Sequence, residues 1–151
     1  MRWVLAVALL GLFGCERAAS RWVADAASIH AQADALVRAS DTARARALLE
    51  DLVHRPVPAA VAAQDRRVVL QDTYARLAFL ALDSGDARQA LRDADAGLSL
   101  GESSDLFAAT LHTVRGRSRE ALGQDADAAR DYEAAQVVAE ALLEQLLSDG
   151  G

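Results

Sequence analysis

The stretch LGQDADAARDYEAA at residues 122–135 contains the pattern on which the fold prediction depends. Ala128 stands five residues after Gly123. Tyr132 follows Ala128 after four residues, and Ala135 follows Tyr132 after three. The same spacing occurs at Gly85, Ala90, Ala94 and Gly97 and, more loosely, at Ser40, Ala45, Leu49 and Leu52. Two antiparallel helices approach closely only where side chains are small, and the turn between them requires a residue that tolerates left-handed dihedral angles. The pattern therefore predicts a repeated helix–turn–helix unit.

Short turn signals divide the chain into six amphipathic stretches, which we predict to be helices. They cover residues 18–39, 42–54, 59–83, 87–99, 105–122 and 126–147. The composition agrees, since 52% of the 151 residues are apolar but only 5% are aromatic. Alanine, the best helix former, fills the difference, and the sparse Gly and Pro argue against a disordered chain. We therefore expect one all-α domain over about residues 18–147.

An aspartate stands where each of three helices is predicted to begin. Asp41, Asp86 and Asp125 each occupy the place of an N-cap residue, whose carboxylate accepts a hydrogen bond from an unpaired N–H group of the first turn. Gln89 follows Asp86 with the spacing of a capping box. We therefore interpret these aspartates as helix caps and not as parts of a functional site.

The repeated pattern resembles the tetratricopeptide (TPR) repeat, whose first helix carries a small residue at its eighth position, followed by a Gly in the turn and an Ala at position twenty. Ala33, Ala78 and Gly116 supply the eighth residue of three units at 26–58, 71–104 and 109–142. Successive turn positions are 45 and 38 residues apart, against about 34 in an ideal repeat, so insertions are expected. The resemblance implies a TPR-like α-solenoid of about three antiparallel helix pairs. An irregular helical bundle with Ala-rich contacts is the alternative.

The charged residues argue against a nucleic-acid ligand. All 16 basic residues are Arg, and with 22 acidic residues the formal net charge is −6. Acidic and basic side chains alternate along most predicted helices, whereas a phosphate backbone is bound through a net basic face.

The N-terminus has the order of a secretory signal. Met1-Arg2 is a short positive start, an unbroken apolar run of 11 residues covers 3–13, and the chain becomes charged at Glu16-Arg17. The run is shorter than the about 20 apolar residues that a membrane-spanning helix needs, which argues against a retained transmembrane anchor.

The segment Leu12-Phe13-Gly14-Cys15 resembles the lipobox of bacterial lipoproteins. The resemblance implies that residues 1–14 are removed as a signal peptide and that Cys15, then the first residue, carries a diacylglyceryl group and a further acyl chain such as palmitate. Several acyl chains would hold the protein permanently in a bilayer. Glu16 stands where an Asp usually signals retention in the inner membrane, which favours the periplasmic face of the outer membrane. Since Cys15 is the only cysteine, an internal disulfide is excluded, while an inert thiol or a nucleophile is the alternative.

The sequence contains no recognisable catalytic or metal-binding motif. His30, His54 and His112 lie in different predicted helices, without an HExxH motif or a cysteine partner. No GxSxG motif and no Gly-rich phosphate loop is present. We therefore predict a non-catalytic protein without a cofactor or a metal ion.

The TPR resemblance implies a groove lined by the first helix of each unit, where solenoids bind peptides or helices. The inner-face positions carry over to His30, Asp34, Arg38, Asp72, Phe79, Asp83, Thr113, Arg117 and Glu120, with Arg76 beside them. The paired basic and amide residues of a carboxylate-clamp TPR are absent. A groove of mixed charge predicts a protein partner in the cell envelope, although these charges could also simply solvate the face.

The end of the last predicted helix carries an apolar stripe, made of Val137, Val138, Ala141, Leu142, Leu146 and Leu147. We expect the preceding helix pair to cover this stripe. If it is uncovered, it predicts a contact with a partner or with another copy. The sequence thus favours a TPR-like lipoprotein that acts as an adaptor in an envelope assembly, and the alternative is a structural lipoprotein that self-associates through stacked repeats.

Overall fold

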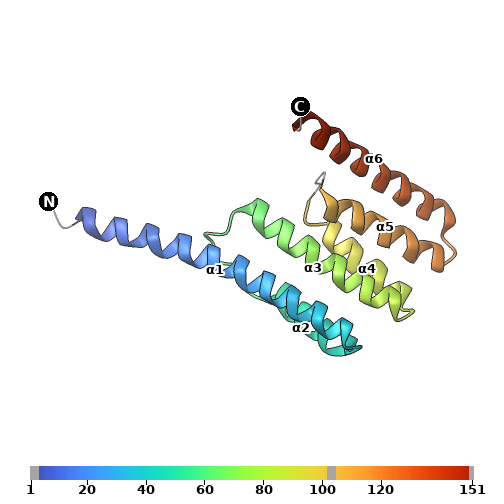
Figure 1. Ribbon diagram of the computed structural model, residues 1–151, viewed down its shortest axis with the longest axis horizontal. Coiled ribbons are helices and arrows are strands. Elements are labelled where there is room, and N and C mark those ends of the chain that lie inside the picture. Colours follow the sequence, from blue (N-terminus) through green and yellow to red (C-terminus); the bar gives the residue numbers. More distant parts are fainter. Residues whose placement is uncertain (1–3, 102–104, 150–151) are drawn as a thin grey trace. The chain divides into compact units, whose positions relative to one another are not determined.

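The chain folds into helices joined by short turns. The computed structural model describes the backbone of residues 4–101 and 105–149 and the side chains of residues 17–101 and 105–149. Within these ranges there is no strand, and the helices are α1 (Val4–Arg38), α2 (Thr42–His54), α3 (Ala63–Asp83), α4 (Ala87–Leu98), α5 (Leu106–Ala121) and α6 (Asp125–Asp149) (Figure 1). The predicted all-α class is confirmed, and α1–α2, α3–α4 and α5–α6 form antiparallel pairs.

The first compact unit, Met1–Val69, pairs α1 with α2. Its core consists of Ala26, Ile29 and Leu52, with Leu48 and Val69 packed against them. Trp22 of α1 is also buried, with 7% of its surface exposed. The apolar residues of α1 recur at three- and four-residue intervals, so they form one stripe, and α2 covers it.

The second compact unit, Leu70–Gly151, contains most of α3 together with α4, α5 and α6. The chain thus contains two compact units, and the single domain expected over about residues 18–147 stays a prediction. The core of the second unit is formed by Ala75, Ala78, Ala81, Ala90, Ala94, Leu111 and Val114. Alanine therefore serves as the close-packing residue between α3 and α4, while Leu111 and Val114 bring α5 against both.

Three turns with the same geometry end α1, α3 and α5. Ser40, Gly85 and Gly123 have φ angles of 61°, 81° and 73°, in the left-handed region. In each turn this residue donates its N–H to the carbonyl three residues earlier, at 2.9–3.0 Å. The following N–H reaches the carbonyl five residues earlier, at 2.8–2.9 Å. This is the Schellman motif, so the predicted turn positions are confirmed in all three pairs, even where Ser replaces Gly.

The small residues of the repeated pattern are buried within the helix pairs. Ala45, Ala90 and Ala128 are 0%, 0% and 2% exposed. At the predicted eighth positions, Ala33 and Ala78 are 2% and 0% exposed, and Gly116 is buried. The spacing read from the sequence therefore identifies the residues that allow each second helix to approach the first.

The predicted helix caps are confirmed at two positions and wrong at a third. The carboxylates of Asp41 and Asp86 accept hydrogen bonds from the third N–H after them, at 3.2 and 2.9 Å. Asp125 is instead the first residue of α6, because the Ala128 N–H donates to the carbonyl of Gln124 at 2.9 Å. Asp105 caps α5, a role that the sequence analysis had not assigned.

Two helices begin elsewhere than predicted. Helix α3 begins at Ala63 and not at residue 59, because the Val61 N–H closes a turn onto the carbonyl of Pro58 at 3.0 Å. Gln89 does not complete the expected capping box, since the Asp86 N–H donates to the carbonyl of Ala81 at 2.9 Å and not to the Gln89 side chain. Helix α1 begins at Val4 and not at residue 18, because its backbone is continuously helical from Val4 to Arg38.

Candidate functional site

The ten residues predicted to line a groove lie on α1, α3 and α5. On α1, His30 is buried, Asp34 is half-buried and Arg38 is exposed. On α3, Asp72 and Arg76 form an ion pair at 2.8 Å, so each satisfies the other's charge. Phe79 packs against the core of the second unit, and Asp83 is exposed at the end of the helix.

The predicted groove residues on α5 also have local partners. The Thr113 hydroxyl donates to the carbonyl of Ala109 at 2.9 Å. Glu120 accepts a hydrogen bond from Tyr132 at 2.7 Å, while Arg117 is exposed. The assignment of a binding face to these positions therefore stays a prediction.

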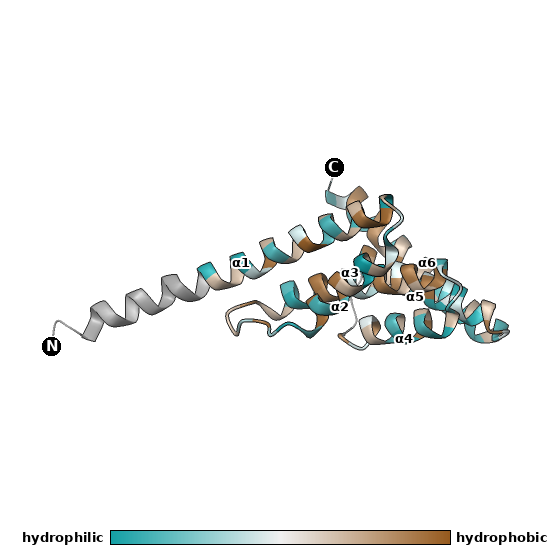
Figure 2. Cartoon of the chain, turned by 90° about the horizontal axis from the view of Figure 1, so that it is seen from below, coloured by the Kyte–Doolittle hydropathy of each residue, from teal (hydrophilic) through white to brown (hydrophobic). Residues whose placement is uncertain are grey.

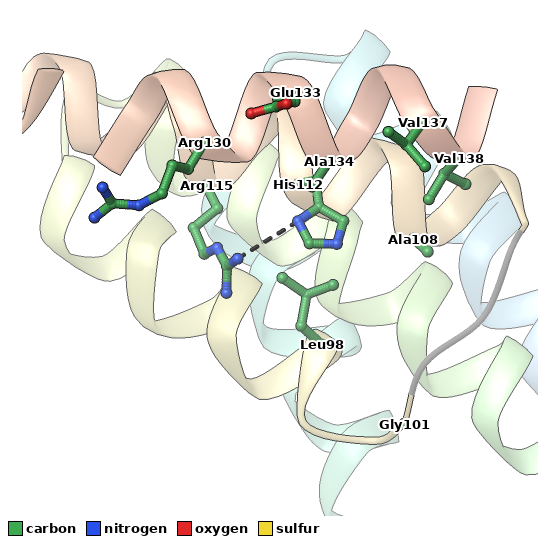
Figure 3. A pocket seen from close by; sticks show the side chains of 10 residues that line it. All are labelled: Leu98, Gly101, Ala108, His112, Arg115, Arg130, Glu133, Ala134, Val137 and Val138. Atoms are coloured by element: carbon green, nitrogen blue, oxygen red, sulfur yellow. Dashed lines mark hydrogen bonds between the residues drawn. The ribbon is translucent and has the colours of Figure 1, made fainter. Parts of the chain in front are cut away.

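A cavity of about 710 Å³ opens in the second unit and is lined by none of these ten residues. It is lined by the end of α4 and the turn after it, by α5 and by the first half of α6 (Figure 3). Its lining residues are Leu98, Gly101, Ala108, His112, Arg115, Arg130, Glu133, Ala134, Val137 and Val138. Val137, Val138 and Ala108 gather at one end of the cavity, and Arg115 and Arg130 lie at the other. The cavity is thus apolar at one end and charged at the other.

The charged end is anchored by a buried carboxylate. Asp131 of α6 is 1% exposed and accepts hydrogen bonds from Arg115 Nε at 2.8 Å and Arg119 Nη1 at 2.9 Å. Arg115 also reaches Asp95 of α4 at 3.2 Å. One side chain therefore links α4, α5 and α6, and its charge is offset by carboxylates on both sides.

His112 is held uncharged beside this network. Burial, and after it the positive charge of Arg115, lowers the pKa of His112 below 6.5, against the smaller opposing effect of Asp131. Arg115 Nη2 lies 3.4 Å from His112 Nδ1. Asp131 Oδ1 lies 3.8 Å from the same nitrogen, so Nδ1 faces a donor from Arg115 and an acceptor from Asp131. The ring therefore contributes a neutral polar surface to the cavity.

This network was not predicted from the sequence. Arg115 and Arg119 are four residues apart and so share one face of α5, which is the signal that could have indicated a common acidic partner. That spacing could not have identified Asp131, because two other aspartates, Asp125 and Asp127, precede it on α6. No group of three or more His, Cys, Asp or Glu side chains is placed to hold a metal ion in the described part of the chain.

The apolar stripe of α6 is uncovered toward its end, and the expectation that the preceding helix pair covers it was wrong. Val137, Leu146 and Leu147 are 60%, 71% and 70% exposed, and Leu143 beside them is 57% exposed. Val138 and Leu142 are half-buried, and Ala141 is exposed. For Leu143, Leu146 and Leu147 the reason is length, since α6 has 25 residues and α5 has 16, so the last turns of α6 extend beyond their antiparallel neighbour. Val137 follows the buried Ala135 by two residues and therefore faces away from the contact with α5. Figure 2 shows hydrophobic residues in these turns, near the C-terminal end.

The side chain of Cys15 and the lipobox around it lie outside the residues whose side chains are described, so lipidation stays a prediction. Across the described ranges, no helix has both the length and the apolar character required to cross a membrane. Comparison with known protein families finds no matching family, and a search of curated proteins finds no match to this chain.

Proposed function

We propose that the chain is a non-catalytic TPR-like lipoprotein that acts as a protein–protein interaction adaptor at the periplasmic face of a bacterial outer membrane. The observation that carries the binding role is the exposed apolar end of α6. Val137 belongs both to this surface and to the lining of the cavity, so the two features adjoin. Exposed apolar patches of this kind mark interaction sites on soluble domains.

The repeated architecture supports the same role. Three helix pairs share one turn geometry and bury small residues at matching positions, as the TPR resemblance implies. Repeat proteins built from such pairs expose long helical surfaces and use them to bind other proteins.

The proposed membrane anchor is tested by fractionation of the native cell. Cys15→Ser removes the thiol that would be acylated, so we expect an uncleaved precursor and loss of the protein from outer-membrane fractions. Glu16→Asp is the matched variant, because it keeps the thiol and should retain the processed protein in the inner membrane. Unchanged processing and location of the Cys15→Ser protein would contradict lipid anchoring.

The proposed adaptor role is tested by photo-crosslinking in the intact envelope. A photoreactive amino acid at position 146, which is exposed on α6, should form an adduct with a different protein. The same residue at position 44, where the native Arg side chain is 78% exposed on α2, is the control and should not form that adduct. An adduct from neither position would contradict the adaptor role.

The alternative is a structural lipoprotein that self-associates through stacked repeats. The exposed end of α6 is also the observation that favours it, because the last helix of a repeat array normally has a polar outer face. Sedimentation of the protein lacking residues 1–15 separates the two functions. A monomer supports the adaptor, and a concentration-dependent oligomer supports stacking.

A further inference from the structure

We propose that the end of α6 binds an amphipathic helix of a partner protein whose apolar stripe is flanked by Lys or Arg side chains. This inference rests on the proposed adaptor function and specifies the chemistry of the partner. The binding surface, called here the α6 patch, consists of Leu142, Leu143, Leu146 and Leu147 with Val137 at its edge.

The α6 patch has the width of a helix-packing surface. Leu142 follows the buried residues Ala128 and Ala135 at seven-residue intervals, and Leu146 continues the same line beyond α5. Leu143 and Leu147 lie beside that line, four residues apart. Apolar residues at i, i+1, i+4 and i+5 form the broad stripe with which a helix contacts another helix. The core stripe of α6 thus continues for two turns without a covering helix from α5.

Every charged side chain that α6 itself carries beside the α6 patch is acidic. Glu140 and Glu144 precede Leu143 and Leu147 by three residues, so they lie next to them on the helix surface. Both glutamates are exposed, and no basic residue follows Arg130 in the chain. Glu140 accepts a hydrogen bond from the neutral side chain of Gln136 at 2.8 Å. A partner that buries the leucines therefore gains most if it brings cations to these carboxylates.

The same charges disfavour a second copy as the occupant. A two-fold symmetric contact would place the α6 patch of one copy against the α6 patch of the other. Glu140 and Glu144 would then face the same two glutamates across the interface, at the edge of a desolvated apolar surface, where like charges repel. A partner helix with an apolar stripe and basic flanks avoids this repulsion.

The test uses residues 15–151 with Cys15→Ser, which is the predicted mature chain without its lipid. The probe is a synthetic amphipathic peptide of about 18 residues, long enough to form a helix, with Leu on one face and Lys on both flanks. A second peptide has Glu in place of every Lys, and a third is the Lys peptide with its order scrambled. Affinities are measured by fluorescence anisotropy at low and high salt.

We expect the Lys peptide to bind at least about tenfold more tightly than the Glu peptide, and high salt to reduce that difference. Leu146→Glu should weaken binding about tenfold or more. Val37→Glu is the matched control, because Val37 is a 41% exposed apolar residue on α1, and it should leave the affinity unchanged. Glu140→Gln with Glu144→Gln should bring the two helical peptides to similar affinities.

Equal binding of all three peptides, or full affinity in the Leu146→Glu protein, would overturn the inference. An oligomer that forms without peptide and is lost in Leu146→Glu would overturn it in favour of a second copy. Helix content measured by circular dichroism accompanies each variant, and Leu147→Gln replaces Leu146→Glu if the latter loses helix. If position 146 crosslinks to an envelope protein while the Lys peptide does not bind, the adaptor function stands and the inferred partner chemistry is wrong.

Discussion

The ring of Tyr132 on α6 packs directly against the backbone of Gly116 on α5. A β-carbon at Gly116 would lie 2.7 Å from Tyr132 Cε1, closer than any ordinary contact. The Tyr132 hydroxyl donates to Glu120, one turn further along α5, at 2.7 Å. Burial, and after it this bond to Glu120, raises the pKa of Tyr132 to about 12. The glycine and the ring therefore form one contact that sets the distance between the two helices.

We predict that Gly116→Ala destabilises the protein by about 1–2 kcal/mol, because the ring must move. In a Tyr132→Ala background the same change should stabilise it by up to about 1 kcal/mol, since alanine is the better helix former. Urea unfolding of the four proteins in a double-mutant cycle measures the coupling. Additive effects would show that the contact does not limit helix approach.

Ala128 tests the repeat alignment. Its side chain is 2% exposed between α5 and α6. Ala128→Glu should therefore lower the free energy of unfolding by about 3 kcal/mol or more, because it buries an unpaired charge. Ala129→Glu is the control, because Ala129 is exposed on the same turn and the change should cost less than about 0.5 kcal/mol. Equal melting temperatures for the two variants would contradict the alignment.

The buried carboxylate of Asp131 should be the most sensitive charge of the second unit. Asp131→Asn leaves Arg115 and Arg119 facing a neutral group, and we predict a loss of about 3 kcal/mol in the free energy of unfolding. Asp95, whose side chain is 52% exposed, contacts the same Arg115, and Asp95→Asn should cost no more than about 1 kcal/mol because water screens that pair. Denaturant unfolding measures the free energy of unfolding of both variants. Similar losses in the two would mean that Asp131 does not anchor the charged end of the cavity.

Acid should weaken the second unit partly through His112. The pKa of His112 is lowered in the folded protein, so below pH 6.5 the unfolded chain binds the proton first. The contribution of the neutral His112 ring to the free energy of unfolding is fully present above pH 6.5. It declines as the pH falls and is lost below the pKa that His112 has in the folded protein. His112→Asn should flatten this decline in stability below pH 6.5. An NMR titration of the ring with a midpoint at or above 6.5 would refute the assignment.

The turns and the close contacts were predictable because each depends on local chemistry. A left-handed turn residue and a small residue five positions later are visible in the sequence, and they identified Gly85 with Ala90 and Gly123 with Ala128. Asp125 was misassigned because aspartate is favoured both at the N-cap and in the first turn of a helix. The exposure of Leu146 was missed because the predicted helices, 105–122 and 126–147, differ less in length than α5 and α6, which have 16 and 25 residues. The pairing of Asp131 with Arg115 and Arg119 joins two helices, and sequence spacing does not determine such contacts.

The burial of Trp22 gives each compact unit its own optical signal. From Cys15 onward Trp22 is the only tryptophan, and it belongs to the first unit. The two tyrosines, Tyr74 and Tyr132, both belong to the second unit. Indole fluorescence therefore follows the melting of the α1–α2 pair, while the near-ultraviolet circular dichroism of the phenol rings follows the other helices. A single sample, heated once, records whether the two units lose their structure together or in sequence.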